Sequence, residues 1–189
     1  NISASGGVYV GVAADRIVSN PGTITGSIGV ILRGNNLSKL LDRVGVKFET
    51  VKSGAFKDIL SPDRALGSEE RELLQALIDS SYEQFVAAVA EGRKLDPSCV
   101  REFADGRVFS GAQAKDLGLV DELGDEECAR VLAAQLADLD EERCRVVTLG
   151  KPRKPLLQGL SGSNLLARIQ ELVTVEMELS GQPLWLFRP

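Results

Sequence analysis

The chain has 189 residues, 43% of them hydrophobic, which is enough for one ordinary domain with a real core, or for most of one plus a tail. Its 27 acidic and 22 basic residues give a net charge of -5, which repels phosphate backbones, so we expect no nucleic-acid partner. The sequence contains no histidine, which excludes every His-dependent triad, His-ligated metal and His general base within this chain.

The cysteines and the ends of the chain set further limits. Cys99, Cys128 and Cys144 are odd in number and form no CxxC pair, so we expect buried or half-buried free thiols, no metal site and no cofactor. No run of 18 apolar residues is present, so no membrane span is expected. The start at Asn1 shows no initiator methionine or signal-peptide pattern, and we expect the chain to begin partway into a longer protein.

The first 30 residues mix glycines, short β-branched runs and turn signals. The pattern predicts strands near Val8 to Val12 and Arg16 to Ser19. Ser5 can equally cap a helix that runs to Ala14, so the first of these elements stays open between strand and helix.

The middle of the chain is dominated by one long helical pattern. A short helix is expected at Asn36 to Val44 and a strand at Lys47 to Lys52. After Gly67, Ser68 is a plausible N-cap, and apolar residues then recur at helical spacing up to Gly92.

Capping residues mark three further helices. Asp96-Pro97 opens one, and the others are expected at Ser110 to Leu117 and Asp125 to Leu136, before a strand at Arg145 to Leu149. No internal repeat is evident, and strands that alternate with helices indicate an α/β layer fold.

These elements divide the chain into three parts. Residues 1–150 form the expected α/β domain, and residues 151–163 form a linker because they hold two prolines, two glycines and little periodicity. Residues 164–189 are expected to form a C-terminal helix and an apolar tail. Such a tail suits docking on a neighbouring chain or on a membrane surface.

The Ser5-Gly6-Gly7 sequence is the first candidate for chemistry. Glycines beside a serine let the backbone approach a reacting carbonyl and aim N–H groups at a developing oxyanion. A tight turn with a capping serine explains the same three residues, and Ser-Gly-Gly alone does not separate the two readings.

A serine nucleophile needs a base, and without histidine the candidates are a lysine or a carboxylate. A lysine can act only where apolar surroundings favour its neutral amine. Lys57 has Phe56 and Ile59 close by in sequence, and Lys52 lies five residues earlier at the end of the expected strand. Spacing alone does not choose between the two lysines.

Three stretches of the sequence resemble a known family, and this resemblance favours one of the two lysines. ASGGVYVGVAADRIVSNPGTITGSIGV, FETVKSGAFKDILSPDR and ADGRVFSGAQAKDLGLVDELG resemble, in order and spacing, the signal peptide peptidase A family of Ser/Lys peptidases. The match covers roughly residues 1–125. It implies an α/β fold of the Clp protease and crotonase-like layered type, truncated here at its N-terminus.

The resemblance implies a role for particular residues. Ser5 matches the family nucleophile and Lys57 its general base, while Ser27 matches a serine that holds the lysine amine. The backbone at Gly6 and Gly7 would serve the oxyanion. The chain has Val8-Tyr9 where the family often has two aromatics, and it begins four residues before Ser5, without the upstream loop that donates a second oxyanion N–H in family members.

The family also implies partners and a location. By resemblance the chain would act as a serine endopeptidase through an acyl-enzyme, on remnant signal peptides and other short or unfolded membrane-proximal peptides. It would form a homo-oligomer at the cell membrane, with the catalytic domain on the extracytoplasmic side and an anchor upstream. The alternatives are a crotonase-like acyl-CoA-binding domain that needs no serine, and a non-catalytic assembly module.

Overall fold

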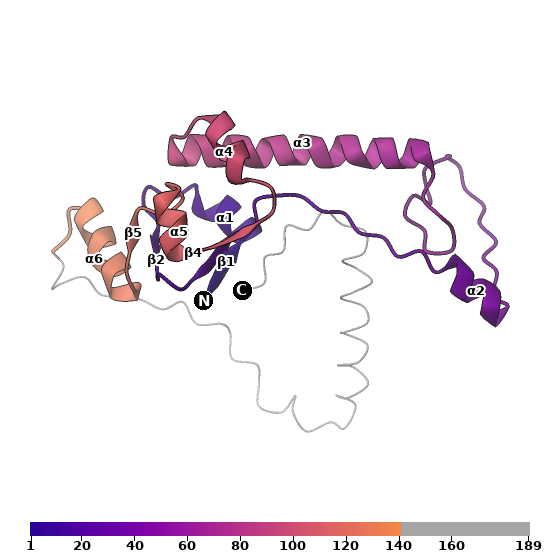
Figure 1. Ribbon diagram of the computed structural model, residues 1–189, viewed down its shortest axis with the longest axis horizontal. Coiled ribbons are helices and arrows are strands. Elements are labelled where there is room, and N and C mark those ends of the chain that lie inside the picture. The colour runs from indigo at the N-terminus through magenta and orange to yellow at the C-terminus, as the bar shows by residue number, and fades with distance from the viewer. Residues whose placement is uncertain (141–189) are drawn as a thin grey trace, which may run out of the picture.

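The computed structural model describes residues 1–140, and the expected strand at 145–149, the linker, the C-terminal tail and Cys144 lie outside the described residues. The described chain alternates strands and helices, so the α/β class is confirmed (Figure 1). The strands are β1 (Ile2–Ala4), β2 (Val18–Ser19), β3 (Ile24–Gly26), β4 (Val108–Ser110) and β5 (Glu122–Leu123). The helices are α1 (Gly6–Gly11), α2 (Ser38–Val44), α3 (Ser68–Arg93), α4 (Pro97–Phe103), α5 (Gly111–Asp116) and α6 (Glu126–Leu136).

Two small sheets organise the body of the molecule. In the first, β3 lies between β1, which is parallel to it, and β4, which is antiparallel. The register pairs Ile2 with Ile24 and Ala4 with Gly26. The second sheet pairs β2 with β5 in parallel. Since the parallel strands β1 and β3 end at the same level, the residues that follow them lie at one edge of the sheet.

The core lies beneath the C-terminal half of α3. Phe85, Val86 and Val89 are buried there against Val8 and Val12, which come from α1 and its C-cap. The α3 helix is 26 residues long, or about 39 Å, so its N-terminal half extends well beyond this core. Figure 1 shows α1 and the first sheet near the C-terminal half, and α2 at the opposite end.

Residues 31–67, here called the arm, form the excursion from the body toward the N-terminal end of α3 (Figure 1). Helix α2 is the arm's one helix, and its remaining described residues are turns and irregular chain. The arm leaves many large apolar side chains exposed: Ile31, Leu37, Leu40, Val44, Val46, Phe48, Val51 and Phe56. Large exposed apolar patches on a domain commonly mark interaction sites.

The helices expected from capping signals are confirmed, although Ser68 is the first residue of α3 and the N-cap is Gly67. Asp96 accepts the Ser98 N–H at 2.8 Å at the start of α4. Ser110 and Gln113 form a reciprocal capping box on α5, and Asp125 accepts the Cys128 N–H at 3.0 Å on α6. Each side chain satisfies an N–H that has no acceptor within its helix.

One element left open between strand and helix is a helix, and one strand prediction is wrong. Val8 to Val12 belongs to α1 and its C-cap, so the helix alternative holds, because Val8 and Val12 are four residues apart and bury the same helical face. Lys47 to Lys52 forms no strand in the described structure, where the exposed arm offers this segment no neighbouring strand to pair with. The strand predicted at Arg16 to Ser19 shortens to β2.

The prediction of buried thiols is also wrong where it can be tested. Cys99 and Cys128 are both exposed, because each lies in the first turn of a helix on the side that faces solvent. Among residues 1–140, no helix is both long enough and apolar enough to cross a membrane, and no cluster of metal-ligating side chains is present.

Candidate active site

Ser5 and Ser27 occupy equivalent positions at the edge of the first sheet. Each follows directly on a paired residue, Ala4 in β1 and Gly26 in β3, so the two serines are neighbours across parallel strands. The Ser5 N–H donates to the Gly26 carbonyl at 2.8 Å, which fixes this relation. The structure therefore brings together two of the serines that the sequence analysis singled out.

Both serines have a backbone conformation that L-residues rarely adopt. Ser5 has φ of 51° and ψ of -113°, and Ser27 has φ of 51°. Such conformations cost on the order of 1–3 kcal/mol and persist only where surrounding contacts enforce them. At Ser5 these contacts are the Gly26 carbonyl on one side and the Tyr9 N–H, which donates to the Ser5 carbonyl at 3.0 Å, on the other.

Gly6 and Gly7 form the first turn of α1, directly after Ser5. The first N–H groups of a helix have no acceptor within that helix, so they are available to an oxyanion next to the serine. Space here is limited, since a Cβ at Gly7 would lie 3.0 Å from Ser3 Oγ. The absence of side chains at both positions leaves the backbone open beside Ser5.

Helix α1 is held in place by its contact with α3. The Tyr9 ring meets the Phe85 ring edge-on, with 5.3 Å between centroids. Close by, a Cβ added at Gly92 would lie 2.1 Å from the Val12 carbonyl oxygen, so glycine is required for this approach of α3 to the end of α1. The position of Ser5 therefore depends on the C-terminal half of α3.

Lys57 lies in a series of tight turns on the arm. Its N–H donates to the Gly54 carbonyl at 3.2 Å, and the Ile59 N–H donates to the Phe56 carbonyl at 3.2 Å. Its side chain is exposed, and among residues 1–140 its amine makes no hydrogen bond or ion pair. Lys52, the other candidate base, is instead bound by the Asp58 carboxylate at 2.6 Å and the Ala55 carbonyl at 2.9 Å.

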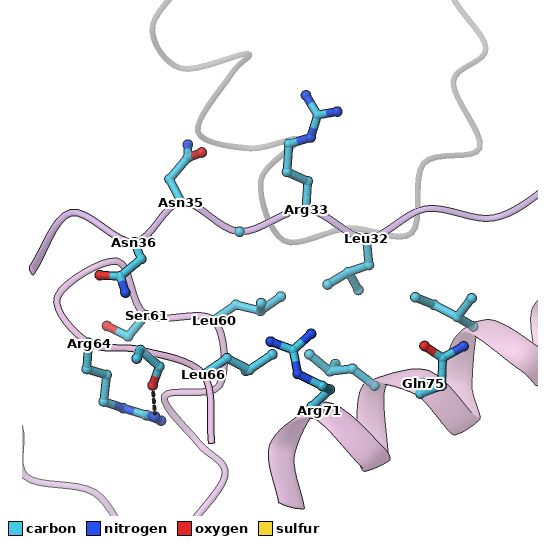
Figure 2. Close-up of a pocket in the computed structure, with 14 residues that line it drawn as sticks. Leu32, Arg33, Asn35, Asn36, Leu60, Ser61, Arg64, Leu66, Arg71 and Gln75 are labelled. Carbon is cyan, nitrogen blue, oxygen red and sulfur yellow. Dashed lines mark hydrogen bonds between the residues drawn. The ribbon is translucent and has the colours of Figure 1, made fainter. Parts of the chain in front are cut away.

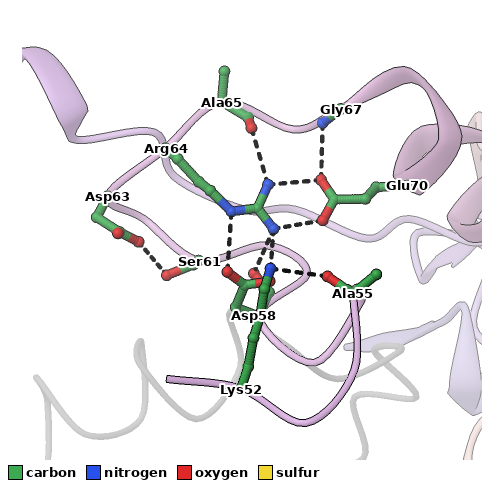
Figure 3. Close-up of polar contacts among 9 residues, drawn as sticks. All are labelled: Lys52, Ala55, Asp58, Ser61, Asp63, Arg64, Ala65, Gly67 and Glu70. Carbon is green, nitrogen blue, oxygen red and sulfur yellow. Dashed lines mark hydrogen bonds and ion pairs between the residues drawn. The ribbon is translucent and has the colours of Figure 1, made fainter. Parts of the chain in front are cut away.

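A cluster of charged residues connects the turns at residues 54–61, here called the Lys57 turn, to the start of α3 (Figure 3). Asp58 is bonded to Arg64, and Arg64 is bonded to Glu70 in the first turn of α3. Hydrogen bonds from Arg64 and then from Lys52 hold the pKa of Asp58 well below its usual range. Arg64 and then the Gly67 N–H lower the pKa of Glu70 to about 2.

The charged cluster attaches the turn around Lys57 to the start of α3, and this position is far from Ser5 of the same chain. Glu70 lies 15 residues, or about 22 Å along the helix axis, from Phe85, against which α1 packs. Figure 1 likewise places α2 and the following arm segment near the N-terminal end of α3, away from α1 and β1. The structure therefore brings Ser5 to Ser27, but it does not bring Lys57 of the same chain to either serine.

A cavity of about 500 Å³ opens beside the charged cluster (Figure 2). Leu32 and Leu60 from the arm and Leu74 and Ile78 from α3 supply its apolar wall. Polar groups around it come from the arm and from α3, and include Arg33, Asn35, Asn36, Ser61, Arg64, Arg71 and Gln75. The cavity thus lies on the arm side of the molecule, with Lys57, rather than beside Ser5.

The segment after α4 makes backbone hydrogen bonds to Ser27 and its neighbour Ile28. The Ser27 N–H donates to the Arg107 carbonyl at 2.7 Å, and the Gly106 N–H donates to the Ile28 carbonyl at 3.0 Å. The Arg107 side chain pairs with Asp105 at 2.5 Å, which is a structural contact within the turn. Gly106 and Gly118 both have positive φ, as expected for turn and helix-end glycines.

Comparison with known proteins decides the family. The model of peptidase family S49 matches residues 1–140. The chain belongs to this family. A Synechocystis protein named "Putative protease" is 56% identical over 198 residues, which cover 100% of this chain and 71% of the relative. Among other relatives, "Putative signal peptide peptidase SppA" of Enterococcus faecium is 46% identical over 68% of this chain, and "Serine protease SPPA, chloroplastic" of Arabidopsis thaliana is 34% identical over 86% of it.

These relatives establish the class of enzyme, a serine peptidase, and favour it over the acyl-CoA-binding alternative. The chain spans 38% of the Enterococcus relative and 24% of the Arabidopsis relative. A solved enoyl-CoA hydratase/isomerase family protein from Hyphomonas neptunium overlaps 98% of this chain and 59% of its own, at 16% identity and a TM-score of 0.36. That overlap is too loose to bear on the chemistry.

The charged cluster around Arg64 was not expected from the sequence. Its members are Lys52, Asp58, Arg64 and Glu70, three of which lie within the second resembling stretch. The available signal was a spacing of six residues between successive members, with charges that alternate in sign. Such a spacing matches no regular helix or strand, so only the folded turns reveal it.

Proposed function

We propose that this chain hydrolyses peptide bonds with Ser5 as nucleophile and Lys57 as general base. The observation that carries the proposal is the strained backbone of Ser5, at the junction of β1 and α1 beside Ser27, in a chain of peptidase family S49. Strain of this kind clusters at active sites, where surrounding structure enforces it. The amine of Lys57, without a partner among the described residues, supports its role over that of Lys52.

The separation along α3 leads us to propose that the two residues of a working site come from different chains. Lys57 on the arm of one chain would reach Ser5 and Ser27 of a neighbouring copy, where the Ser27 hydroxyl would hold the amine. The exposed apolar side chains of the arm favour docking on a partner surface, and most oligomers of soluble proteins are symmetric assemblies of one chain. The sequence also allowed a non-catalytic module that serves assembly. In this proposal, assembly of several copies is a requirement for catalysis, so the two readings no longer exclude each other.

The proposed reaction is acyl transfer in two halves. The neutral amine of Lys57 takes the Ser5 hydroxyl proton while Oγ bonds to the substrate carbonyl carbon. The N–H groups of Gly6 and Gly7 stabilise the resulting oxyanion, and one such donor is typically worth ~3–4 kcal/mol. The C–N bond then breaks and the lysine proton passes to the leaving amine. Water hydrolyses the serine ester, with its proton taken by the lysine, and Ser5 is restored.

The proposed substrates are remnant signal peptides and other short or unfolded membrane-proximal peptides, in line with the name of the Enterococcus relative. The proposed location is the cell membrane, with the catalytic domain on the extracytoplasmic side and attachment through an upstream segment. Peptide cleavage by membrane-bound and released fractions of the full protein, on signal-peptide and unrelated unfolded substrates, tests both points.

Mixing two inactive variants tests the shared site. Ser5→Ala and Lys57→Ala should each abolish peptide hydrolysis, and a mixture refolded together should recover roughly a quarter of the parental rate if copies assemble at random. Refolding each variant separately and mixing afterwards controls for contamination. No recovery on joint refolding contradicts a site shared between chains, and full activity of either single variant contradicts the dyad itself.

A further inference from the structure

Arg64 is the centre of the charged cluster that surrounds the Lys57 turn (Figure 3). Its guanidinium reaches both carboxylate oxygens of Asp58, at 2.9 Å from Nη2 and 3.3 Å from Nε. The same Nη2 contacts the Asp58 main-chain carbonyl at 3.2 Å, which is one peptide from Lys57. Arg64 therefore holds the backbone next to Lys57 as well as a side chain.

The far side of the guanidinium is anchored on α3. Arg64 contacts the two Glu70 carboxylate oxygens at 2.5 and 2.8 Å, and Glu70 is only 6% exposed. Glu70 also accepts the Gly67 N–H at 2.8 Å at the start of the helix. A planar guanidinium that bonds two carboxylates fixes their relative orientation as well as their distance. The single ammonium group of a lysine in this place would fix only the distance.

The opposite end of the turn is held by the same cluster. Lys52 contacts Asp58 and also the Ala55 carbonyl, so the residues on both sides of Lys57 are fixed. Leu60, just beyond, has φ of 65°, which an unconstrained leucine avoids. The whole turn is therefore built around contacts that leave the Lys57 amine itself unoccupied.

We propose that Arg64 is a positioning residue for the peptidase reaction, which fixes the Lys57 turn to the first turn of α3 and balances the carboxylate charge beside the base. This inference rests on the proposed function of Lys57. Arg64 touches neither substrate nor reacting atoms, and acts through Asp58. The arm thereby presents its lysine to the serine site of the neighbour as a preformed unit.

The charges around Lys57 predict that variants of Arg64 and of Asp58 change the pH dependence of the rate in opposite directions. The charged groups of the turn are Lys52, Asp58, Asp63 and Arg64, and those that face it from α3 and the start of the arm are Glu70, Arg71 and Arg33. Within the four-membered cluster two cations match two carboxylates. Loss of the Arg64 charge leaves an excess carboxylate near the base and favours the protonated lysine, while loss of the Asp58 charge has the opposite effect.

The test is the pH dependence of kcat/KM for four variants of the full chain in its assembled form. Arg64→Gln should lower kcat on the order of 10²-fold, as expected when a reacting group is misplaced by about 1 Å, and should move the midpoint of the rate profile to higher pH by about half a unit or more. Asp58→Asn breaks the same ion pair and should move that midpoint to lower pH. Arg64→Lys keeps the charge but not the planar guanidinium, so it should lower kcat with the midpoint unchanged.

Arg101→Gln is the matched control, because it removes an exposed arginine–glutamate pair, with Glu83, far from the arm. It should leave rate and profile unchanged. Circular dichroism and unfolding midpoints identify any variant that fails to fold, and Arg64→Lys and Asp58→Asn then carry the test in place of Arg64→Gln. Shifts of the same sign in Arg64→Gln and Asp58→Asn, or parental kcat in Arg64→Lys, overturn the inference.

Adding Lys57→Ala to this set of variants separates this inference from the proposed function. If Lys57→Ala keeps full activity, the base assignment fails and the role of Arg64 fails with it. If Lys57→Ala is inactive while Arg64→Gln keeps the parental rate and profile, only the role of Arg64 is overturned.

Discussion

Replacing Gly92 by alanine tests whether the contact between α1 and α3 positions Ser5, the proposed nucleophile. A Cβ at Gly92 would lie 2.1 Å from the Val12 carbonyl oxygen and 3.0 Å from the Val12 Cβ, whereas ordinary van der Waals contact begins near 3.4 Å. The obstructing atom is backbone and cannot rotate away, so the end of α1 must move by about 1 Å to relieve the overlap.

The magnitude follows from two opposing effects. Alanine favours a helix interior over glycine by about 1 kcal/mol, while overpacking of this kind costs typically 1–3 kcal/mol. We expect a net loss of up to about 2 kcal/mol, measured as a lower urea midpoint at unchanged m-value. Because α1 follows Ser5 directly, a displacement of about 1 Å should also reduce kcat on the order of 10²-fold.

Gly11→Ala is the matched control, since a Cβ at Gly11 meets no atom within 4 Å. It should raise stability by a few tenths of a kcal/mol to about 1 kcal/mol and leave the rate unchanged. A Gly92→Ala variant as stable and as active as the parent would refute the reasoning, because the close approach would then exert no constraint on Ser5.

Three further outcomes are expected. Burial by itself raises the pKa of Asp121, but hydrogen bonds from Arg93 and from the Ile17 N–H lower it below its ordinary value, so its stabilisation is present above about pH 4 and is lost as pH falls through the lowered pKa. Asp121→Asn should therefore cost about 1–3 kcal/mol in urea unfolding at pH 7 and progressively less as pH falls below about 4, and a cost that does not decrease with pH would contradict the assignment. Phe85→Ala, at a fully buried ring, should cost about 3–5 kcal/mol, and a loss under 1 kcal/mol would show that this core is not as packed as described. Cys99 should react with a maleimide in the native protein at the rate of an open thiol, whereas labelling that requires denaturant would contradict its exposure.

Short-range signals in the sequence were sufficient to predict most helices. Asp96, Ser110 and Asp125 each cap the helix expected to follow them, because a cap depends only on the next three residues. The choice between strand and helix at Val8 to Val12 needed tertiary information, since β-branched residues favour strands locally and the core contact with α3 decided for a helix.

The candidate site was predictable only in part, for the same reason. Ser5 and Ser27 follow strands that pair, so residues far apart in the chain become neighbours through a short sheet register. Lys57 lies within the irregular arm, and its place depends on Arg64 and Glu70, whose spacing has no periodic signature. No pattern in a single sequence indicates that a residue would serve a neighbouring copy rather than its own chain.

The positive φ values of Ser5 and Ser27 imply a conflict between catalysis and durability. Glycine adopts this backbone region without a steric penalty, so Ser5→Gly would relieve strain of the order of 1–3 kcal/mol, at the expense of about 0.5–1 kcal/mol in added freedom of the unfolded chain. The inactive protein would then be at least as robust as the active one. Selection for heat resistance alone, with no demand for peptide cleavage, should accordingly enrich glycine at position 5 and remove the proposed nucleophile.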